Sequence, residues 1–182
     1  MFSLWSLVLS VVLLPSIQCV PDVQPQQVHL SLGKDATEMM VTWLTVDAMD
    51  TRPVVEYGPI DSHPSFPLTA SGWSSQFVDG GSEQRVMYIH RVLLEGLSPA
   101  GGYYYHVGGP DGWSDVFWFT AMQEGSDWSP RFAIYGDLGS ANGQSIPRLQ
   151  QEVARGSFDM ILHVGDMAYD LHTVSGKDTR LY

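Results

Sequence analysis

The sequence predicts an all-β sandwich followed by the beginning of an α/β domain, because the spacing of apolar residues changes part-way along the chain. Between residues 25 and 122, apolar and polar residues alternate along several short runs, which is typical of half-buried strands. Glycine-rich turns separate these runs at short intervals, as they do in β-sandwiches. From residue 131 onwards, two apolar runs flank a segment with helical spacing, which is typical of a β-α-β unit.

Short strands are expected throughout the first domain, residues 25–122, about seven in all. The clearest alternation places them at 28–32, 39–43, 54–57, 90–94, 103–107 and 117–119. Trp43 is expected in the core between the two sheets, because large aromatic side chains bury much of their surface. Leu97-Ser98-Pro99, followed by Tyr103, predicts a tyrosine corner, in which the phenol bonds back to the backbone. The region resembles a fibronectin type III-like domain.

The second domain, residues 131–182, is expected to contain one β-α-β unit and to be incomplete. Its elements are a strand at 132–135, a glycine-rich loop at 136–143, a helix from about Ser145 to Arg155 and a strand at 158–164. Pro147 suits a first helical turn, and Gly156 is a typical residue just after a helix end. The two strands are predicted to be parallel. One such unit cannot bury both faces of a parallel sheet, so we expect the rest of an α/β domain to be missing.

The composition argues against several classes of partner. The chain has 182 residues and a formal net charge of -11, from 20 acidic and 9 basic residues. No cluster of Lys and Arg offers the basic face that nucleic acids require, and the acidity disfavours binding to anionic membranes. A phosphate substrate would therefore need a local positive charge, such as a bound metal ion.

The N-terminus predicts secretion. The apolar run from Leu4 to Leu14 is too short to span a bilayer and is typical of a signal peptide, which we place at residues 1–19. We therefore expect no stable membrane insertion. The basic residues that usually begin such a peptide are missing, and a core strand at the start of the chain is the alternative. Cys19 is the only cysteine, so no disulfide can form within the chain.

Two Gly-Asp motifs, each following an apolar run, contain the candidate functional residues. Gly136-Asp137-Leu138-Gly139 follows the first strand, and Gly165-Asp166-Met167-Ala168-Tyr169 follows the second. Because the strands are predicted to be parallel, both aspartates lie at the carboxyl edge of the sheet, where open α/β sheets bind ligands. Carboxylates can bridge two cations, and a pair of ions can orient water and a phosphate for in-line attack.

Tyr169 favours a ferric ion over zinc alone. An ordinary tyrosine has a pKa of about 10, so it is a poor ligand for most divalent ions, whereas ferric iron is acidic enough to displace the proton. Taken singly, these residues have other interpretations: Asp137 could cap a turn or a helix start, and Tyr169 could be a half-buried aromatic residue. The order of all three residues favours a metal site.

Together, the two motifs and the preceding sandwich resemble the purple acid phosphatases. The motifs are similar to the first two of that family's five metal-ligand blocks, and the resemblance covers residues 25–172. It implies that Asp137 binds ferric iron, that Asp166 bridges the iron and a second divalent ion (zinc, iron or manganese), and that Tyr169 binds the iron and gives the purple colour. It also implies hydrolysis of phosphate monoesters at acid pH.

After Tyr169 the sequence departs from the family's pattern. The family has a Gly-Asn-His block and two later histidine blocks, whereas the single asparagine here, Asn142, is followed by glycine. His163 is predicted to be a buried, hydrogen-bonded residue within its strand, and His172 could approach the site only from a loop. No histidine remains to position the phosphate or to protonate the leaving group. We therefore expect this chain to be inactive, or nearly so, on its own.

Two other functions stay open. The sandwich could be a non-catalytic interaction module, with a C-terminal segment that has no role in catalysis. A different phosphoesterase, with a zinc or manganese pair, is disfavoured by Tyr169 and by the preceding sandwich. The sequence does not indicate an oligomeric state.

Overall fold

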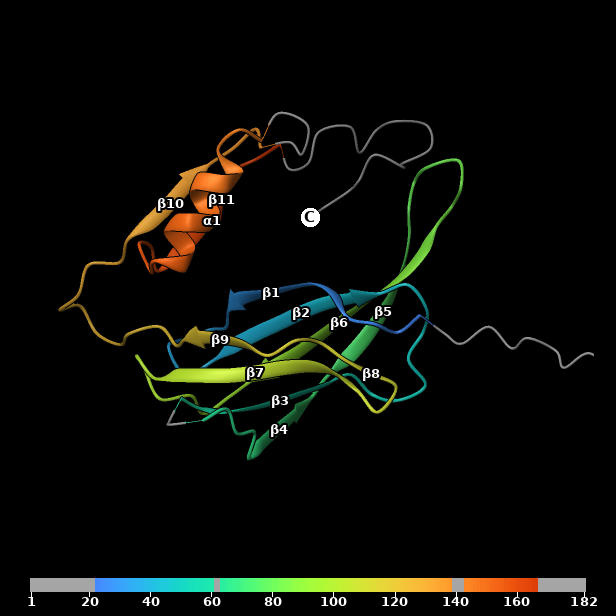
Figure 1. Ribbon diagram of the computed structural model, residues 1–182, viewed down its shortest axis with the longest axis horizontal. Helices are drawn as coiled ribbons and strands as arrows, with labels where there is room; N and C mark the ends of the chain where they lie inside the picture. Colours follow the sequence, from blue (N-terminus) through green and yellow to red (C-terminus); the bar gives the residue numbers. More distant parts are fainter. Residues whose placement is uncertain (1–21, 61–62, 139–142, 167–182) are drawn as a thin grey trace, which may run out of the picture.

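Two antiparallel β-sheets packed face to face make up most of the molecule (Figure 1), and a small β-α-β unit follows them. The computed structural model describes residues 22–60, 63–138 and 143–166. The first sheet has the order β1 (Gln26–Leu32), β2 (Met39–Thr45), β6 (Val86–Leu94) and β5 (Trp73–Val78). The second has the order β4 (Leu68–Ser71), β3 (Val54–Pro59), β7 (Gly102–Gly109) and β8 (Gly112–Trp113), and β9 (Phe117–Thr120) also pairs with β7. The mainly β architecture predicted from the alternation is thereby confirmed.

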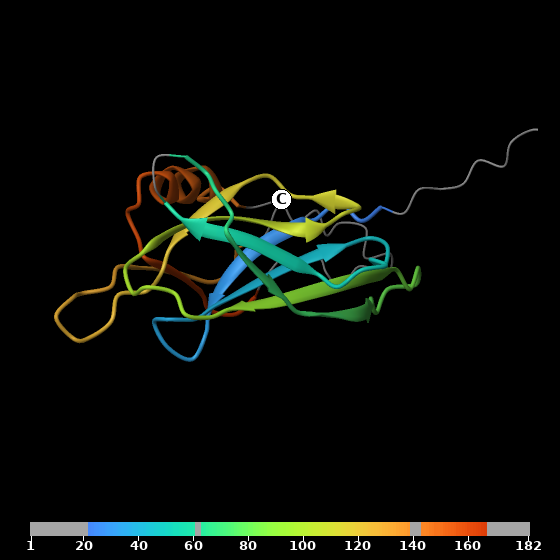
Figure 2. The ribbon, with the colours of Figure 1, turned by 90° about the horizontal axis from the view of Figure 1, so that it is seen from below.

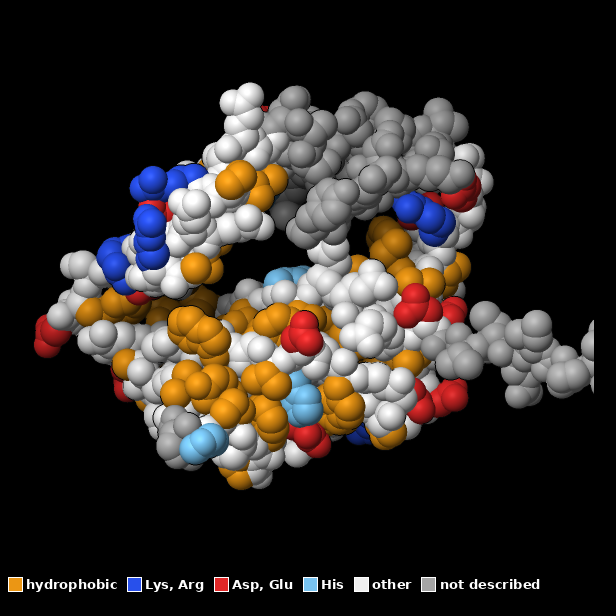
Figure 3. Space-filling model, in the orientation of Figure 1, with side chains coloured by type: hydrophobic (Ala, Val, Ile, Leu, Met, Phe, Trp, Pro, Cys, Tyr) orange, Lys and Arg blue, Asp and Glu red, His pale blue; other side chains and the backbone are white. Residues whose placement is uncertain are grey.

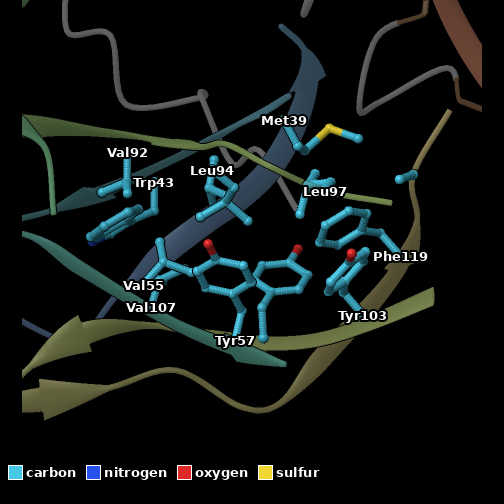
Figure 4. Close-up of a cluster of buried hydrophobic side chains, with 13 residues drawn as sticks. Met39, Trp43, Val55, Tyr57, Val92, Leu94, Leu97, Tyr103, Val107 and Phe119 are labelled. Carbon is cyan, nitrogen blue, oxygen red and sulfur yellow. The ribbon is translucent and has the colours of Figure 1, made fainter. Parts of the chain in front are cut away.

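The core lies between these sheets, and alternate residues of the central strands supply it (Figure 4). Val41 and Val92 are opposite one another on β2 and β6, and neither is exposed to solvent. Val55 and Val107 are the equivalent pair on β3 and β7 and are equally buried. Trp43 is 1% exposed, which confirms its predicted place in the core. Burial of this apolar surface is the main term that stabilises the sandwich.

The tyrosine corner predicted at Tyr103 is present. The backbone N–H of Ser98 donates a hydrogen bond to the Tyr103 hydroxyl oxygen, at 2.8 Å. The ring of Tyr103 stacks on Phe119 in the core, with 5.5 Å between the ring centres. The corner therefore ties the loop before β7 to the packed interior.

Three strands of the sandwich, β4, β5 and β8, were not predicted from the sequence. β4 and β5 are separated by Gly72 alone, where the chain leaves the second sheet and joins the first. A Cβ atom at Gly72 would lie 1.8 Å from the Arg91 carbonyl oxygen, so this crossing needs glycine. The alternation is weak in β5 because its small and polar residues, Ser74, Ser75 and Gln76, fall on both faces.

The second unit contains β10 (Phe132–Tyr135), α1 (Ile146–Ala154) and β11 (Met160–His163), with the two strands parallel. Figure 2 shows α1 end-on beside the sandwich. Pro147 lies in the first turn of the helix and Gly156 follows its end with a φ of 66°. The helix and both strands therefore lie where the sequence placed them, except that β11 is shorter at each end. No helix among the described residues is long and apolar enough to cross a membrane.

Apolar side chains on one face of this strand pair are exposed. Ile134 is 64% exposed and Phe132 is 43% exposed. Leu162 and Val164 on the neighbouring segment are also exposed, at 39% and 66%. A single helix covers at most one face of the pair, so the residues on the other face have no layer against them within the described chain.

Candidate metal centre

The two Gly-Asp motifs leave the parallel pair at the same edge. Tyr135, the last residue of β10, lies opposite His163, the last residue of β11. The pairing continues for one more step, because the Val164 N–H donates to the Tyr135 carbonyl oxygen at 2.7 Å. Asp137 and Asp166 follow directly, so topology brings two of the three predicted ligands to one edge of the sheet.

Both aspartates have a left-handed backbone. The φ angle is 55° at Asp137 and 45° at Asp166, in a region that non-glycine residues seldom occupy. Aspartate tolerates this conformation better than most residues, because its short side chain can bond to the nearby backbone. Unusual backbone angles of this kind gather at functional sites, where the surrounding structure maintains them. The same feature at two neighbouring strand ends supports a shared role for the two residues.

The glycine before each aspartate has a definite steric reason. A Cβ atom at Gly136 would lie 2.5 Å from the Val164 carbonyl oxygen, so only glycine lets the two strand ends approach this closely. Gly165 has a φ of 75°, which favours glycine for conformational rather than steric reasons. Gly136 is therefore needed for the close approach of the two strand ends, and Gly165 for the backbone conformation of the turn before Asp166.

The edge offers two carboxylates, which by themselves do not make up a metal site. Both carboxylates belong to exposed residues, and carboxylate oxygens are the donors that hard cations prefer. Within residues 22–60, 63–138 and 143–166, no three His, Cys, Asp or Glu side chains are grouped so that they could hold a metal ion. Tyr169 and His172 lie outside the described residues. The described part of the chain thus provides two carboxylates as candidate oxygen ligands, and a complete metal site would need more.

Two other predictions for this region concern the N-terminal cap of α1 and the surroundings of His163. The N-terminal cap of α1 is Ser145, so Asp137 does not cap this helix. His163 was expected to be buried and hydrogen-bonded, but its buried Nε2 atom has no hydrogen-bond partner among the described residues. The imidazole instead lies against the Tyr135 ring, with 4.9 Å between the ring centres. The expectation of a hydrogen bond was wrong at this atom, and the imidazole has an aromatic neighbour instead.

A second group of functional candidates, missed in the sequence, lies on the outer face of the β3–β7 sheet. The His106 ring stacks between Phe66 and Trp113, with ring centres 4.4 and 4.3 Å away. Its Nε2 atom lies 2.9 Å from a Glu56 carboxylate oxygen. Figure 3 shows hydrophobic side chains around a histidine over this part of the sandwich. The strict alternation of Tyr103, Tyr105 and Val107 could have placed His106 on the outer face, but nothing in the sequence connected it to Phe66.

Comparisons with known proteins agree with this architecture. Residues 25–121 match the family described as "Purple acid Phosphatase, N-terminal domain". Acid phosphatase type 7 of zebrafish (Danio rerio) is 49% identical over 154 residues, which are 85% of this chain and 34% of the relative. The Fe(3+)-Zn(2+) purple acid phosphatase 12 of Arabidopsis thaliana is 28% identical over 80% of this chain and 30% of its own length.

A solved structure shows the same fold. The purple acid phosphatase from yellow lupin (Lupinus luteus) seeds superimposes with a TM-score of 0.66 at 24% identity, over 80% of this chain and 30% of that one. The chain therefore spans about a third of the length of the curated relatives that it matches.

Proposed function

The chain belongs to the purple acid phosphatase family, and we propose that it contributes the N-terminal sandwich and the first metal ligands of an acid phosphatase acting on phosphate monoesters. The observation that carries this proposal is the meeting of Gly136-Asp137 and Gly165-Asp166 at one edge of a parallel strand pair. In the same proposal, the sandwich is fibronectin type III-like, and residues 131–182 begin a metallophosphoesterase domain.

The donor set of this edge fits a dinuclear centre of ferric iron and a divalent ion. By the resemblance, Asp137 would hold the iron, Asp166 would bridge the two ions, and Tyr169 would be a further ligand of the iron. The second ion would be zinc, iron or manganese. When bound, such a pair supplies Lewis acidity and a nucleophile at acid pH. The relative from Arabidopsis whose name includes Fe(3+) and Zn(2+) supports this choice of metals.

The residues of this chain have a positioning role in that chemistry. The tight approach of Gly136 to Val164 fixes the separation of the strand ends, and each aspartate follows with a left-handed backbone. Ligands that the fold orients in advance lose less freedom when a metal binds, which favours binding.

The direct test of this function is a chimaeric protein. The chain would be continued by the C-terminal two thirds of the zebrafish relative and assayed at acid pH with p-nitrophenyl phosphate, iron and zinc. We expect hydrolysis, and Asp137→Asn or Asp166→Asn should lower its rate by at least about 100-fold. Removing a residue that only hydrogen-bonds a metal ligand already lowers activity by up to about 100-fold, and removing the ligand itself should lower it at least as much. Asp111→Asn, at an exposed turn of the sandwich, is the matched control and should leave the rate unchanged.

For the 182-residue chain alone, we propose that activity is absent or very low. Its sequence has no Gly-Asn-His block and no histidine pair with the spacing of metal ligands. The same assay on this chain, with iron and zinc added, should give no turnover above buffer. Metal-dependent turnover that Asp166→Ala abolishes would show that the sequence is catalytically sufficient and that this part of the proposal is wrong.

Secretion is part of the same proposal, with residues 1–19 as the signal peptide. Expression in a secreting cell, followed by N-terminal sequencing, would test it. A mature protein that begins near Val20 supports the proposal, and a retained protein that begins at Met1 contradicts it.

A second function, as an interaction module, is favoured by the stacked rings on the outer face of the sandwich. Trp118 lies on β9 opposite Tyr104 and is 60% exposed, so the aromatic surface extends beyond the His106 stack. Exposed aromatic patches often mark binding sites. Loss of a partner from a pull-down after Trp118→Ser, with the fold intact, would support this function. Retention of metal binding by the β-α-β unit would still favour the phosphatase.

A further inference from the structure

Strand β5 forms an edge of the first sheet that lacks the usual protection against pairing. It is hydrogen-bonded to β6 on one side, and no other described strand pairs with it. Figure 2 shows it running along the margin of its sheet, outside β6. Its sequence, Trp73-Ser-Ser-Gln-Phe-Val78, contains no charge, no proline and no bulge. Natural proteins normally use at least one of these devices on an exposed edge.

The other edges of the sandwich are protected in recognisable ways. β1 carries a bulge, because its register with β2 shifts between Gln26 and His29 and Gln27 has a φ of 55°. In the second sheet, β4 and β9 have four residues each and β8 has two, so they offer little backbone for pairing. β5, with six residues, is therefore unusual among the described edges of the sandwich.

The register of β5 with β6 determines which backbone groups face outwards. The Asp79 N–H donates to the Arg85 carbonyl oxygen, so the backbone of residue 79 faces the β6 side. The residues whose backbone groups face the partner strand alternate along an antiparallel ladder. Trp73, Ser75 and Phe77 therefore bond to β6, whereas Ser74, Gln76 and Val78 point their N–H and C=O groups towards the open edge. The outward N–H of Gly72 agrees with this alternation, since it bonds to Pro53 on the far side.

We propose that β5 pairs with β5 of a second copy of this chain, antiparallel about a two-fold axis at Ser75. Only registers that join outward-facing residues are possible. In the register centred on Ser75, Ser74 of each copy exchanges both backbone hydrogen bonds with Gln76 of the other. Trp73 then lies opposite Phe77 of the other copy, twice, in the closer type of antiparallel pair.

The side chains of β5 favour this partner over an unrelated strand. The sequence is self-complementary about Ser75: an aromatic residue, a polar residue, serine, a polar residue and an aromatic residue. Trp73 and Phe77 are 50% and 46% exposed and lie on the same face of the sheet, so each could cover the other across the axis. Aromatic cross-strand pairs stabilise sheets, and an uncharged strand avoids like charges at a two-fold axis.

The contact would join the two four-stranded sheets into one of eight strands. On the outer face of this joined sheet, Trp73 and Phe77 of the two copies would form one continuous surface. A single strand pair buries less surface than most stable dimers, so the association should be weak and dependent on concentration. Because the contact is closed by two-fold symmetry, it should stop at a dimer rather than form fibres.

Cysteine cross-linking tests both the partner and the register. In a Cys19→Ser background, Ser75→Cys should form a disulfide-linked dimer under mild oxidation, because the two copies of residue 75 face each other. Gln76→Cys is the matched control and should remain monomeric, because residue 76 faces residue 74. Cross-linking by Gln76→Cys and not by Ser75→Cys would overturn the proposed register.

Sedimentation equilibrium of the native sequence tests the association itself. We expect a monomer–dimer equilibrium that Gln76→Pro weakens by at least about tenfold, because proline removes an N–H that only the partner uses. Gln76→Ala keeps that N–H and should dimerise normally, and circular dichroism would verify that both variants fold. A native chain that stays monomeric at every concentration, or a dimer unaffected by Gln76→Pro, would overturn the proposal. If Gln76→Pro fails to fold, the cysteine variants decide.

Discussion

At the scale of single residues, the most unusual polar group in the sandwich is the buried His90. Its Nε2 atom lies 2.9 Å from the Thr45 hydroxyl oxygen, and its Nδ1 atom lies 2.8 Å from that of Ser74. Thr45 donates its own proton to the Asp47 carbonyl oxygen, so it accepts from the Nε2–H. Nδ1 is then the acceptor for the Ser74 hydroxyl. The imidazole is therefore neutral, with its tautomer fixed by the surrounding bonds.

This arrangement predicts a loss of stability in acid. Burial lowers the pKa of His90 from 6.5 to about 4, so the folded state binds fewer protons than the unfolded state between these values. The contribution of neutral His90 to the free energy of unfolding is fully present above pH 6.5. It is lost as pH falls towards 4, and the total loss is about 3 kcal/mol. Denaturant titrations at pH 7 and at pH 4.5 should show this loss.

Two variants make the test specific. His90→Gln should reduce the dependence of the unfolding free energy on pH, since glutamine does not titrate. Gln76→Ala, at an exposed position of β5 and without a titratable group, should leave it unchanged. An unchanged pH dependence in His90→Gln would mean that other groups cause the acid sensitivity.

A second prediction at this scale concerns Gly136. Gly136→Ala places a Cβ atom 2.5 Å from the Val164 carbonyl oxygen and should force the two strand ends apart. Amide hydrogens of β10 and β11 should then exchange faster with solvent, while those of the sandwich keep their protection. Gly80→Ala, at a turn where an added Cβ meets nothing within 4 Å, is the control. Equal protection in both variants would show that the strand ends do not need this close approach.

At the scale of elements, the sequence was most informative where one periodicity dominates. The strands around Trp43 and Val107, and the helix with Ile146, Leu149 and Val153 at helical spacing, were all predictable from sequence. β5 was not, because an edge strand has no buried face to impose alternation on its residues. The contact of His106 with Phe66 was also beyond sequence reasoning, because it joins residues 40 positions apart through the arrangement of the sheet.

For the candidate site, the sequence predicted which residues lie at one edge of the sheet. It did not predict their backbone conformation or the packing around them. The parallel pairing of β10 and β11 placed Asp137 and Asp166 at one edge, as expected from the motif order. The left-handed backbone of both residues could not be predicted, because aspartate usually adopts other conformations. The unsatisfied Nε2 atom of His163 depends on packing between strands, which no local pattern records.

The open face of the β10–β11 pair gives a prediction at the level of elements. Ile134→Ala should change the free energy of unfolding by less than about 1 kcal/mol, because most of that side chain is already in water. Val92→Ala, in the centre of the sandwich, should cost about 2 kcal/mol or more. Thermal or denaturant unfolding of the two variants would compare them directly. Similar costs would mean that this face is covered in solution.

At the scale of the whole molecule, the net negative charge bears on how a phosphate ester could bind. The acidic chain repels anions at long range, so a phosphate ester would depend on a local cation for binding. In Figure 3, Lys and Arg side chains gather over α1, where Arg148 and Arg155 both pair with Glu152. These arginines are thereby partly neutralised. A cation held by the proposed ligands Asp137 and Asp166 would be a stronger local attraction for phosphate.

We propose that Asp137 and Asp166, at the end of the β10–β11 pair, share one iron site with Tyr169. The decisive measurement is a titration with ferric iron, followed by visible absorption, of the chimaeric protein that continues this chain with the C-terminal part of the zebrafish relative. We expect a tyrosinate-to-iron band that Tyr169→Phe abolishes and that Asp137→Asn or Asp166→Asn greatly weakens, while Asp111→Asn leaves it intact. Iron binding of equal strength and colour in all four variants would show that these residues do not form the iron site.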